Sequence, residues 1–189
     1  MYKILAAAAV VVAFGGLSAS AAFAQNMTLT SAEVADGSTI KDAQVANVFG
    51  CKGGNISPSL SWSGAPSDTK SFAIAVYDPD APTGSGFWHW VVFNIPASVT
   101  SLPKGAGDAK KKLTPKGAIQ SRNDYGFDGY GGPCPPTGDK PHHYQITVFA
   151  VDVDKLPDAK DHNVSAAVVG YDLHFHTLAK ATLTGMYGR

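Results

Sequence analysis

The chain has 189 residues and a formal net charge of zero, because 15 Lys and Arg residues balance 15 Asp and Glu residues. This length is sufficient for one domain with a substantial hydrophobic core. The balanced charge excludes the broad basic surplus of proteins that bind nucleic acids or anionic membrane surfaces, so any electrostatic role must be confined to a local site.

The first 24 residues have the pattern of a secretory signal peptide. Lys3 provides the positive start, residues 4–14 form an apolar run, and Ala22-Phe23-Ala24 matches an A-x-A cleavage site. The apolar run is too short for a transmembrane anchor. We therefore expect cleavage after Ala24, a single domain over residues 25–189 without a transmembrane segment, and a periplasmic or secreted location.

Short apolar runs separated by Gly and Pro make up the rest of the chain. Short apolar runs divided by these turn-forming residues are typical of an all-β domain. The predicted strands cover residues 27–31, 59–62, 71–78, 87–95 and 144–152. A helix is predicted from Val164 to about His174, with Asn163 as its N-cap. A last strand is predicted to end with residues 184–187.

The strand over residues 71–78 carries a carboxylate at the end of an apolar face. With strict alternation, Asp78 lies on the same face as Ile74 and Val76. Asp80 follows two residues later and adds a second carboxylate. Polar groups at the end of a buried strand favour a small, pre-formed site over a packing role.

The strand over residues 87–95 carries His89 between two tryptophans. If the strand contains no bulge, alternation places His89 on the same face as Val91 and Phe93 and both tryptophans on the other. Because both faces are then largely apolar, this strand is predicted to be central in its sheet.

The strand over residues 144–152 predicts which of two adjacent histidines faces the site. Tyr144 belongs to its apolar face, and the same period extended backwards selects His142. His143 is in phase with polar positions, so we expect it nearer to solvent.

A loop rich in glycine and proline, residues 124–136, precedes this last histidine pair. Glycine lets the backbone approach a ligand closely, and main-chain N–H groups can point at an anion. An imidazole can donate to a phosphate oxygen. A nearby carboxylate repels an anion unless it fixes a histidine tautomer, accepts a ligand proton or meets an ammonium group. The predicted site for a phosphate-type group comprises Asp78, His89, His142 and the backbone of Gly132 and Pro133.

Two cysteines, Cys51 and Cys134, lie in Gly-rich loops. An even count in an exported chain favours a disulfide, and two free thiols are the alternative. No C-x-x-C redox pair is present, and two cysteines cannot form a structural zinc site without histidine ligands.

Several motifs occur in the order found in a known family. They are Gly53-Gly54-Asn55-Ile56-Ser57-Pro58-Ser59-Leu60-Ser61-Trp62, Asp78-Pro79-Asp80-Ala81-Pro82, Trp88-His89-Trp90, Gly131-Gly132-Pro133 and Pro141-His142-His143-Tyr144. With these motifs, the chain resembles the phosphatidylethanolamine-binding protein family, in particular its bacterial Raf-kinase-inhibitor-like branch. The resemblance covers nearly all of residues 25–189, and the exported form with Cys51 and Cys134 is similar to a periplasmic sub-branch.

The resemblance implies a mainly β fold, an antiparallel β-sandwich with a few peripheral helices, one of them near the C-terminus. It also implies a small pocket for phosphate-type anionic head groups. The ligand-binding residues that it implies are Asp78, Asp80, His89, Gly132, Pro133, His142 and Tyr144. The family often has Arg after its second pocket histidine, and His143 occupies that position here.

These observations predict an exported, non-enzymatic binding module for a small phosphorylated or other anionic ligand, with modulation or inhibition of an unknown protein partner as a further role. No cofactor, metal or nucleic-acid partner is expected. The alternative is an acid–base hydrolase that uses Asp78, His89 and His142, although the chain lacks a G-x-S-x-G nucleophile elbow. His174 and His176 are two residues apart, as metal ligands on a strand would be, but they fall where the predicted helix ends.

Overall fold

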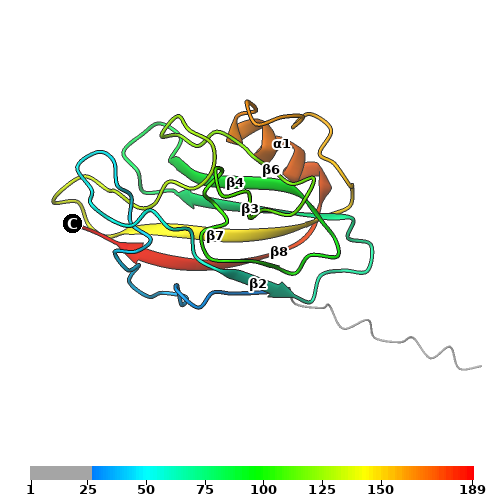
Figure 1. Ribbon diagram of the computed structural model, residues 1–189, viewed down its shortest axis with the longest axis horizontal. Coiled ribbons are helices and arrows are strands. Elements are labelled where there is room, and N and C mark those ends of the chain that lie inside the picture. The colour runs from blue at the N-terminus through cyan, green and yellow to red at the C-terminus, as the bar shows by residue number, and fades with distance from the viewer. Residues whose placement is uncertain (1–26) are drawn as a thin grey trace, which may run out of the picture.

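A computed structural model describes residues 27–189, so the predicted signal peptide of residues 1–24 lies outside the described residues. A five-stranded antiparallel sheet with strand order β6-β4-β3-β7-β8 forms the centre of the fold (Figure 1). Its strands are β3 (Ser71–Asp78), β4 (Phe87–Pro96), β6 (Ile119–Gln120), β7 (His142–Val151) and β8 (Thr177–Tyr187). The predicted strands at 71–78 and 87–95 therefore form its middle, with β3 between β4 and β7.

A three-stranded sheet lies on one side of the larger sheet (Figure 1). Its strands, in the order β1-β2-β5, are β1 (Thr28–Thr30), β2 (Leu60–Ser63) and β5 (Ser101–Leu102). The main hydrophobic core forms between the sheets, where Leu60 and Trp62 of β2 join Ile74 and Val76 of β3. Burying large apolar side chains from both inner faces is the main stabilising term of such an arrangement. The predicted antiparallel β-sandwich is confirmed.

The other face of the five-stranded sheet is covered by α1 (Ala166–His176), the one α-helix of the described residues (Figure 1). Val169 and Leu173 of this helix pack with Ala75 and Val91 in a second apolar cluster. Within residues 27–189, no helix combines the length and the apolar character needed to cross a lipid bilayer.

The N-cap of α1 is Ser165, whose hydroxyl accepts a hydrogen bond from the N–H of Val168. The predicted N-cap, Asn163, is therefore wrong by two residues. Both residue types favour this position, because each can satisfy a free N–H of the first turn. The local sequence alone consequently does not distinguish between them.

A bulge interrupts the pairing of β3 with β4. Val76 pairs with Trp90 and Tyr77 pairs with Trp88, so His89 is an extra residue on β4 without a partner on β3. Such a bulge re-aims the side chains on either side of it.

The bulge changes the face on which His89 lies. Its ring contacts Tyr144 of the main core edge-on, with 5.1 Å between ring centroids. Val91 and Phe93, in contrast, belong to the cluster beneath the helix. The prediction that His89 shares a face with Val91 and Phe93 is therefore wrong, because it assumed unbroken alternation.

Candidate functional site

Three neighbouring inner strands of the large sheet, β4, β3 and β7, have their ends side by side at one end of the sheet. Because β3 is antiparallel to both β4 and β7, its C-terminal end lies beside the N-terminal ends of the other two. Asp78 ends β3, His89 lies near the start of β4, and His142 begins β7. All three residues are buried. The structure thus brings together the three side chains that sequence analysis singled out.

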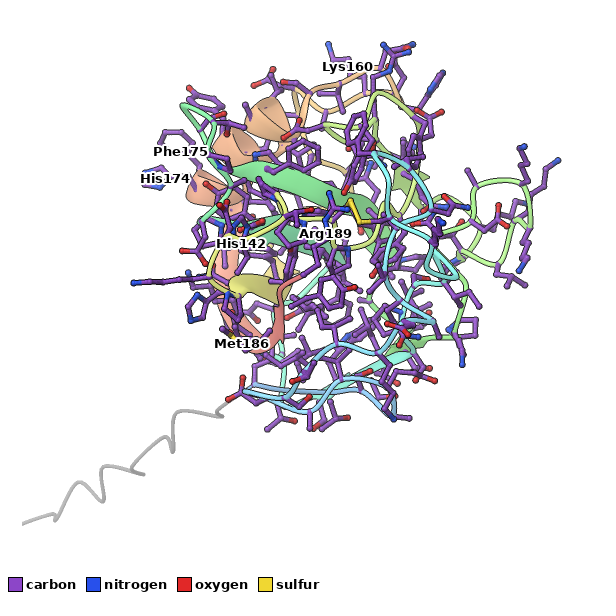
Figure 2. The ribbon with its side chains drawn as sticks, turned by 90° about the vertical axis from the view of Figure 1, so that its left-hand side faces the viewer. His142, Lys160, His174, Phe175, Met186 and Arg189 are labelled. Carbon is purple, nitrogen blue, oxygen red and sulfur yellow. A yellow bond between two sulfur atoms is a disulfide. The ribbon has the colours of Figure 1, made fainter. Side chains whose placement is uncertain are left out.

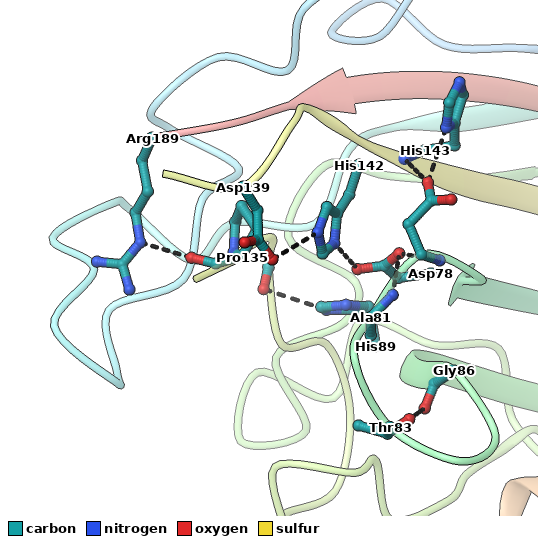
Figure 3. Close-up of polar contacts among 12 residues, drawn as sticks. Asp78, Ala81, Thr83, Gly86, His89, Pro135, Asp139, His142, His143 and Arg189 are labelled. Atoms are coloured by element: carbon teal, nitrogen blue, oxygen red, sulfur yellow. Dashed lines mark hydrogen bonds and ion pairs between the residues drawn. The ribbon is translucent and has the colours of Figure 1, made fainter. Parts of the chain in front are cut away.

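The carboxylate of Asp78 is fully engaged by donors of the protein (Figure 3). Its Oδ1 accepts the N–H groups of Asp80 and Ala81 at 2.9 and 3.1 Å. Its Oδ2 lies 2.8 Å from Nδ1 of His142. Because a carboxylate accepts here, Nδ1 of His142 carries the hydrogen, and Asp78 fixes both the tautomer and the orientation of this ring.

The second nitrogen of His142 faces another carboxylate. Its Nε2 lies 3.5 Å from Oδ2 of Asp139, which is on the loop before β7 (Figure 3). This contact is an ion pair only when the ring is protonated, because Nδ1 already carries the hydrogen and a neutral Nε2 has only a lone pair. Asp139 therefore places a second carboxylate beside this histidine.

His89 is held by main-chain carbonyls instead. Its Nδ1 lies 2.8 Å from the oxygen of Gly131 and 3.1 Å from that of Gly132. Carbonyls only accept, so Nδ1 carries the hydrogen and Nε2 has a free lone pair in the neutral ring. No hydrogen bond found among residues 27–189 involves Nε2.

Burial lowers the pKa of His89 below its ordinary value, and it outweighs the opposing effects of the Gly131 carbonyl and the negative charge of Asp78. Desolvation disfavours the charged imidazolium more than these partners stabilise it. The ring of His89 is therefore neutral at neutral pH and presents an unprotonated Nε2.

These groups surround a cavity of about 100 Å³. Its lining consists of Phe49, Asp78, Ala81, Pro82, Thr83, Phe87, His89, Tyr125, Cys134, Pro135, Pro136, His142 and Tyr144. This volume is well below the roughly 300–1,000 Å³ of pockets that hold drug-sized ligands. The cavity can therefore admit a chemical group of only a few atoms.

Two tyrosines supply hydroxyls at this cavity. The hydroxyl of Tyr125 donates to the Gly132 carbonyl at 2.8 Å. The hydroxyl of Tyr144 is buried and has no partner in the described part of the chain. Burial, assisted by the charge of Asp78, raises the pKa of both phenols above the usual range. Both therefore remain protonated, and Tyr144 has a hydrogen left to donate.

Asp80 is directed away from the cavity and toward His143. Its Oδ2 accepts from both the N–H and Nδ1 of His143, each at 2.7 Å (Figure 3). These hydrogen bonds, the main-chain one first, lower the pKa of the Asp80 carboxyl. His143 is exposed whereas His142 is buried, which confirms the predicted phase of β7.

Gly132 and Pro133 frame the site but do not line the cavity. The N–H of Gly132 donates to Oδ1 of Asn55 at 2.8 Å, and the Pro133 carbonyl accepts the N–H of Ala46 at 3.0 Å. A Cβ at Gly132 would collide with the main chain of Gln44. Glycine is therefore required here by backbone packing, and its carbonyl serves the site through His89.

The predicted disulfide between Cys51 and Cys134 is present, with an S–S distance of 2.07 Å and a sequence separation of 83. Cys134 belongs to the cavity lining, as do its neighbour Pro135 and Phe49, which precedes Cys51 by two residues. The disulfide therefore joins two loops at the rim of the cavity.

Arg189 reinforces the same rim. Its Nε donates to the carbonyl of Pro135 at 2.6 Å (Figure 3). Its Nη2 lies 3.4 Å from the carbonyl of Phe49. Sequence analysis missed Arg189, Phe49 and Tyr125. Only Tyr125 carried a usable signal, as an aromatic residue inside the Gly-rich loop already singled out.

In the part of the chain that the structure describes, no three His, Cys, Asp or Glu side chains are grouped as ligands for one metal ion. His174 lies on α1, away from the cavity at His89. Nδ1 of His176 lies 2.8 Å from Oδ1 of Asp152.

The family model for phosphatidylethanolamine-binding protein matches residues 30–188, which include the whole five-stranded sheet and every residue that lines the cavity. The chain belongs to the phosphatidylethanolamine-binding protein family. Membership of this family indicates a ligand-binding module. The UPF0098 protein YbcL of Escherichia coli is 54% identical over 177 residues and covers 94% of this chain and 94% of the relative. The UPF0098 protein YbhB of the same organism is 45% identical over 161 residues, with 85% and 99% covered.

Solved structures of the same family share the fold. The crystal structure of E. coli YbcL, described as a new member of the mammalian PEBP family, gives a TM-score of 0.84 at 53% identity, covering 87% of this chain and 99% of that chain. The homologue CT736 from Chlamydia trachomatis gives a TM-score of 0.71 at 31% identity, again covering 87% and 99%.

Proposed function

We propose that the chain is an exported, non-enzymatic binding module whose cavity takes a phosphate-type anionic group. One observation carries this proposal: Nε2 of His89 is an unpaired imidazole nitrogen at a cavity large enough for only a few atoms. The export part rests on the signal pattern of residues 1–24.

The surroundings of Asp78 are compatible with an anion in the cavity. An unpartnered carboxylate there would repel a phosphate, but both oxygens of Asp78 already accept hydrogen bonds from the chain. Its role is to orient His142, which is one of the conditions under which a carboxylate can lie beside an anion.

His89 binds the anion by taking up a proton. Nδ1–H stays on the main-chain carbonyls, and a protonated Nε2 donates a charge-assisted hydrogen bond to a ligand oxygen. The hydroxyl of Tyr144 is available as a second donor. The ligand therefore raises the pKa of His89 from its depressed value, and anion binding is coupled to proton uptake.

The cavity volume limits the bound part of the ligand to a phosphoryl group or a head group of similar size. The remainder of the ligand must lie over the rim, where Phe49, Pro82 and Pro136 present apolar surface. A protein partner whose activity this chain modulates or inhibits would contact the same rim.

Calorimetric titration with inorganic phosphate and with phosphoethanolamine tests the proposal. We expect saturable binding to the wild-type protein, a loss of at least about tenfold in affinity for His89→Ala, and unchanged affinity for His143→Ala. His143 is the matched control, because it lies nearby and has its own carboxylate partner outside the cavity. No saturable heat at millimolar ligand, or equal losses in both variants, would overturn the proposal.

The second candidate is the hydrolase, because the Asp78–His142 pair has the arrangement that orients a general base. However, Nε2 of His142 faces Asp139, and in residues 27–189 no hydroxyl or thiol is hydrogen-bonded to either imidazole. Release of p-nitrophenol from p-nitrophenyl phosphate, dependent on His142, would favour the hydrolase over the binding module.

A further inference from the structure

A groove of about 530 Å³ lies between α1 and the outer face of the large sheet. Its lining consists of Ala75, Trp88, Val91, Phe149, Ala166, Val169, Gly170, Leu173, His174, Thr177, Leu178, Ala179 and Lys180. Most of these side chains are apolar. The groove shares no lining residue with the cavity at His89, so it is a separate feature of the molecule.

Gly170 keeps this groove open. It lies inside α1 with an ordinary φ, and a Cβ built on it would meet no atom within 4 Å. Glycine in a helix interior is unfavourable relative to alanine. Neither backbone strain nor crowding within the chain requires glycine here, and the space that its missing side chain leaves belongs to the groove.

The helix beside the groove also presents apolar side chains to solvent. Val168, Tyr171 and Phe175 recur at the i, i+3, i+7 spacing of one helix face, and Tyr171 and Phe175 are 60% and 62% exposed. Leu178 continues this surface onto β8 at 41% exposure. Figure 2 shows Phe175 and His174 at the periphery of the molecule. Exposed apolar side chains gathered on one helix face favour an interaction site.

The only ionisable side chains that line the groove are basic ones, His174 and Lys180. His174 lies in the last turn of α1, and Lys180 is the fourth residue of β8. None of the ion pairs found in residues 27–189 includes either of them. The groove therefore combines an apolar lining with a cationic group whose charge is not neutralised by the chain.

We propose that this groove binds an anionic amphiphile, with its hydrocarbon chain along α1 and its carboxylate at Lys180 and His174. The volume lies within the roughly 300–1,000 Å³ of small-molecule pockets, which are mostly apolar with a few polar groups that fix orientation. Charge complementarity selects an anionic over a neutral or cationic head group. This site is independent of the proposed phosphate cavity.

Calorimetric titration of the purified protein with octanoate, decanoate and dodecanoate, each below its micelle concentration, tests the ligand class. Affinity is expected to rise about fourfold for each added methylene, which corresponds to ~0.8 kcal/mol. Decanol is expected to bind more weakly than decanoate, and Lys180→Ala is expected to remove that difference. Affinity that is independent of chain length, or absence of saturable binding, would overturn the proposal.

Two methionine substitutions on the same helix test the location. Gly170→Met fills the groove and is expected to weaken dodecanoate binding at least about tenfold, with an unchanged or higher melting temperature because methionine is a better helix former than glycine. Ala167→Met adds the same side chain at an exposed position outside the groove lining, and it should bind like the wild type. Equal binding by both variants would overturn the proposal. Sedimentation provides a further test. A concentration-dependent dimer that excludes dodecanoate, and that Gly170→Met dissociates, would also overturn the proposal, because a second copy of the chain would then occupy the groove.

Discussion

Asp78 and His142 form a 2.8 Å hydrogen bond between side chains that are only 3% and 5% exposed. The two residues are 64 positions apart in the sequence, and the antiparallel pairing of β3 with β7 brings them together. The same carboxylate accepts two main-chain N–H groups of the following turn. The pair therefore links the pairing of β3 with β7 to the geometry of the cavity.

Asp78→Asn should destabilise the protein strongly. The single oxygen of an asparagine amide cannot accept all three hydrogen bonds, and leaving a buried donor unsatisfied typically costs about 1–3 kcal/mol. The measurement is the free energy of unfolding in urea. Asp80→Asn is the control, because its pair with His143 is largely exposed and such pairs contribute about 1 kcal/mol or less. Similar losses in both variants would show that burial of Asp78 is energetically unimportant.

His89 should make folding stability depend on pH. Burial depresses its pKa below the ordinary 6.5, so the unfolded chain takes up a proton first as the pH falls. The contribution of His89 to stability is therefore present above about pH 6.5 and is lost as the pH falls toward the depressed folded-state pKa. The difference in unfolding free energy between wild type and His89→Gln, followed over this range, isolates the effect. A difference that does not change with pH would contradict the depressed pKa.

Phosphate affinity should change with pH in the opposite direction. Because binding requires a protonated Nε2 on His89, affinity is expected to rise as the pH falls toward the depressed pKa of the free ring and to level off below it. Calorimetry in buffers of different ionisation enthalpy should detect proton uptake on binding. Flat affinity, after correction for the titration of phosphate itself, would indicate that a neutral ring holds the ligand.

Arg189→Met should weaken phosphate binding, although Arg189 does not line the cavity itself. The substitution removes the hydrogen bonds to the carbonyls of Pro135 and Phe49, and both residues line the cavity. Arg189→Lys is expected to restore little, because one ammonium group cannot reproduce the planar set of donors of a guanidinium. Arg122→Met, at an exposed position outside the cavity lining, is the control in the same calorimetric titration. Full affinity in Arg189→Met would show that the disulfide alone shapes the rim.

Reduction of the Cys51–Cys134 disulfide should lower the melting temperature. A disulfide that closes a loop of 83 residues stabilises by about 4–5 kcal/mol in the chain-entropy model. For a chain of this size that corresponds to roughly 10 °C or more. Calorimetric melting with and without reductant, together with thiol titration, measures the effect. Two titratable thiols before reduction would show that the disulfide does not form in solution.

The sequence alone determined the strands that carry the site and the phase of two of them. The period of two in side-chain direction is a local property, so it placed Asp78 on the buried face of β3 and separated buried His142 from exposed His143. The short apolar runs between Gly and Pro residues predicted an all-β domain, and the resemblance to the family implied that its sheets form a sandwich. The pairing of Cys51 with Cys134 followed from the count of cysteines and the predicted compartment.

Tertiary structure decided what local periodicity does not encode. Pairing with β3 inserts the bulge that turns His89 toward Tyr144, against the alternation of its own strand. The partner of the Gly132 N–H is Asn55, 77 residues away, so this glycine frames the site without lining the cavity. Arg189 reaches the rim only because β8 runs beside β7. In each case the position of a functional group depends on contacts between segments that are distant in sequence. The free energy of those contacts is a property of both segments together, so the local sequence of one segment does not reveal it.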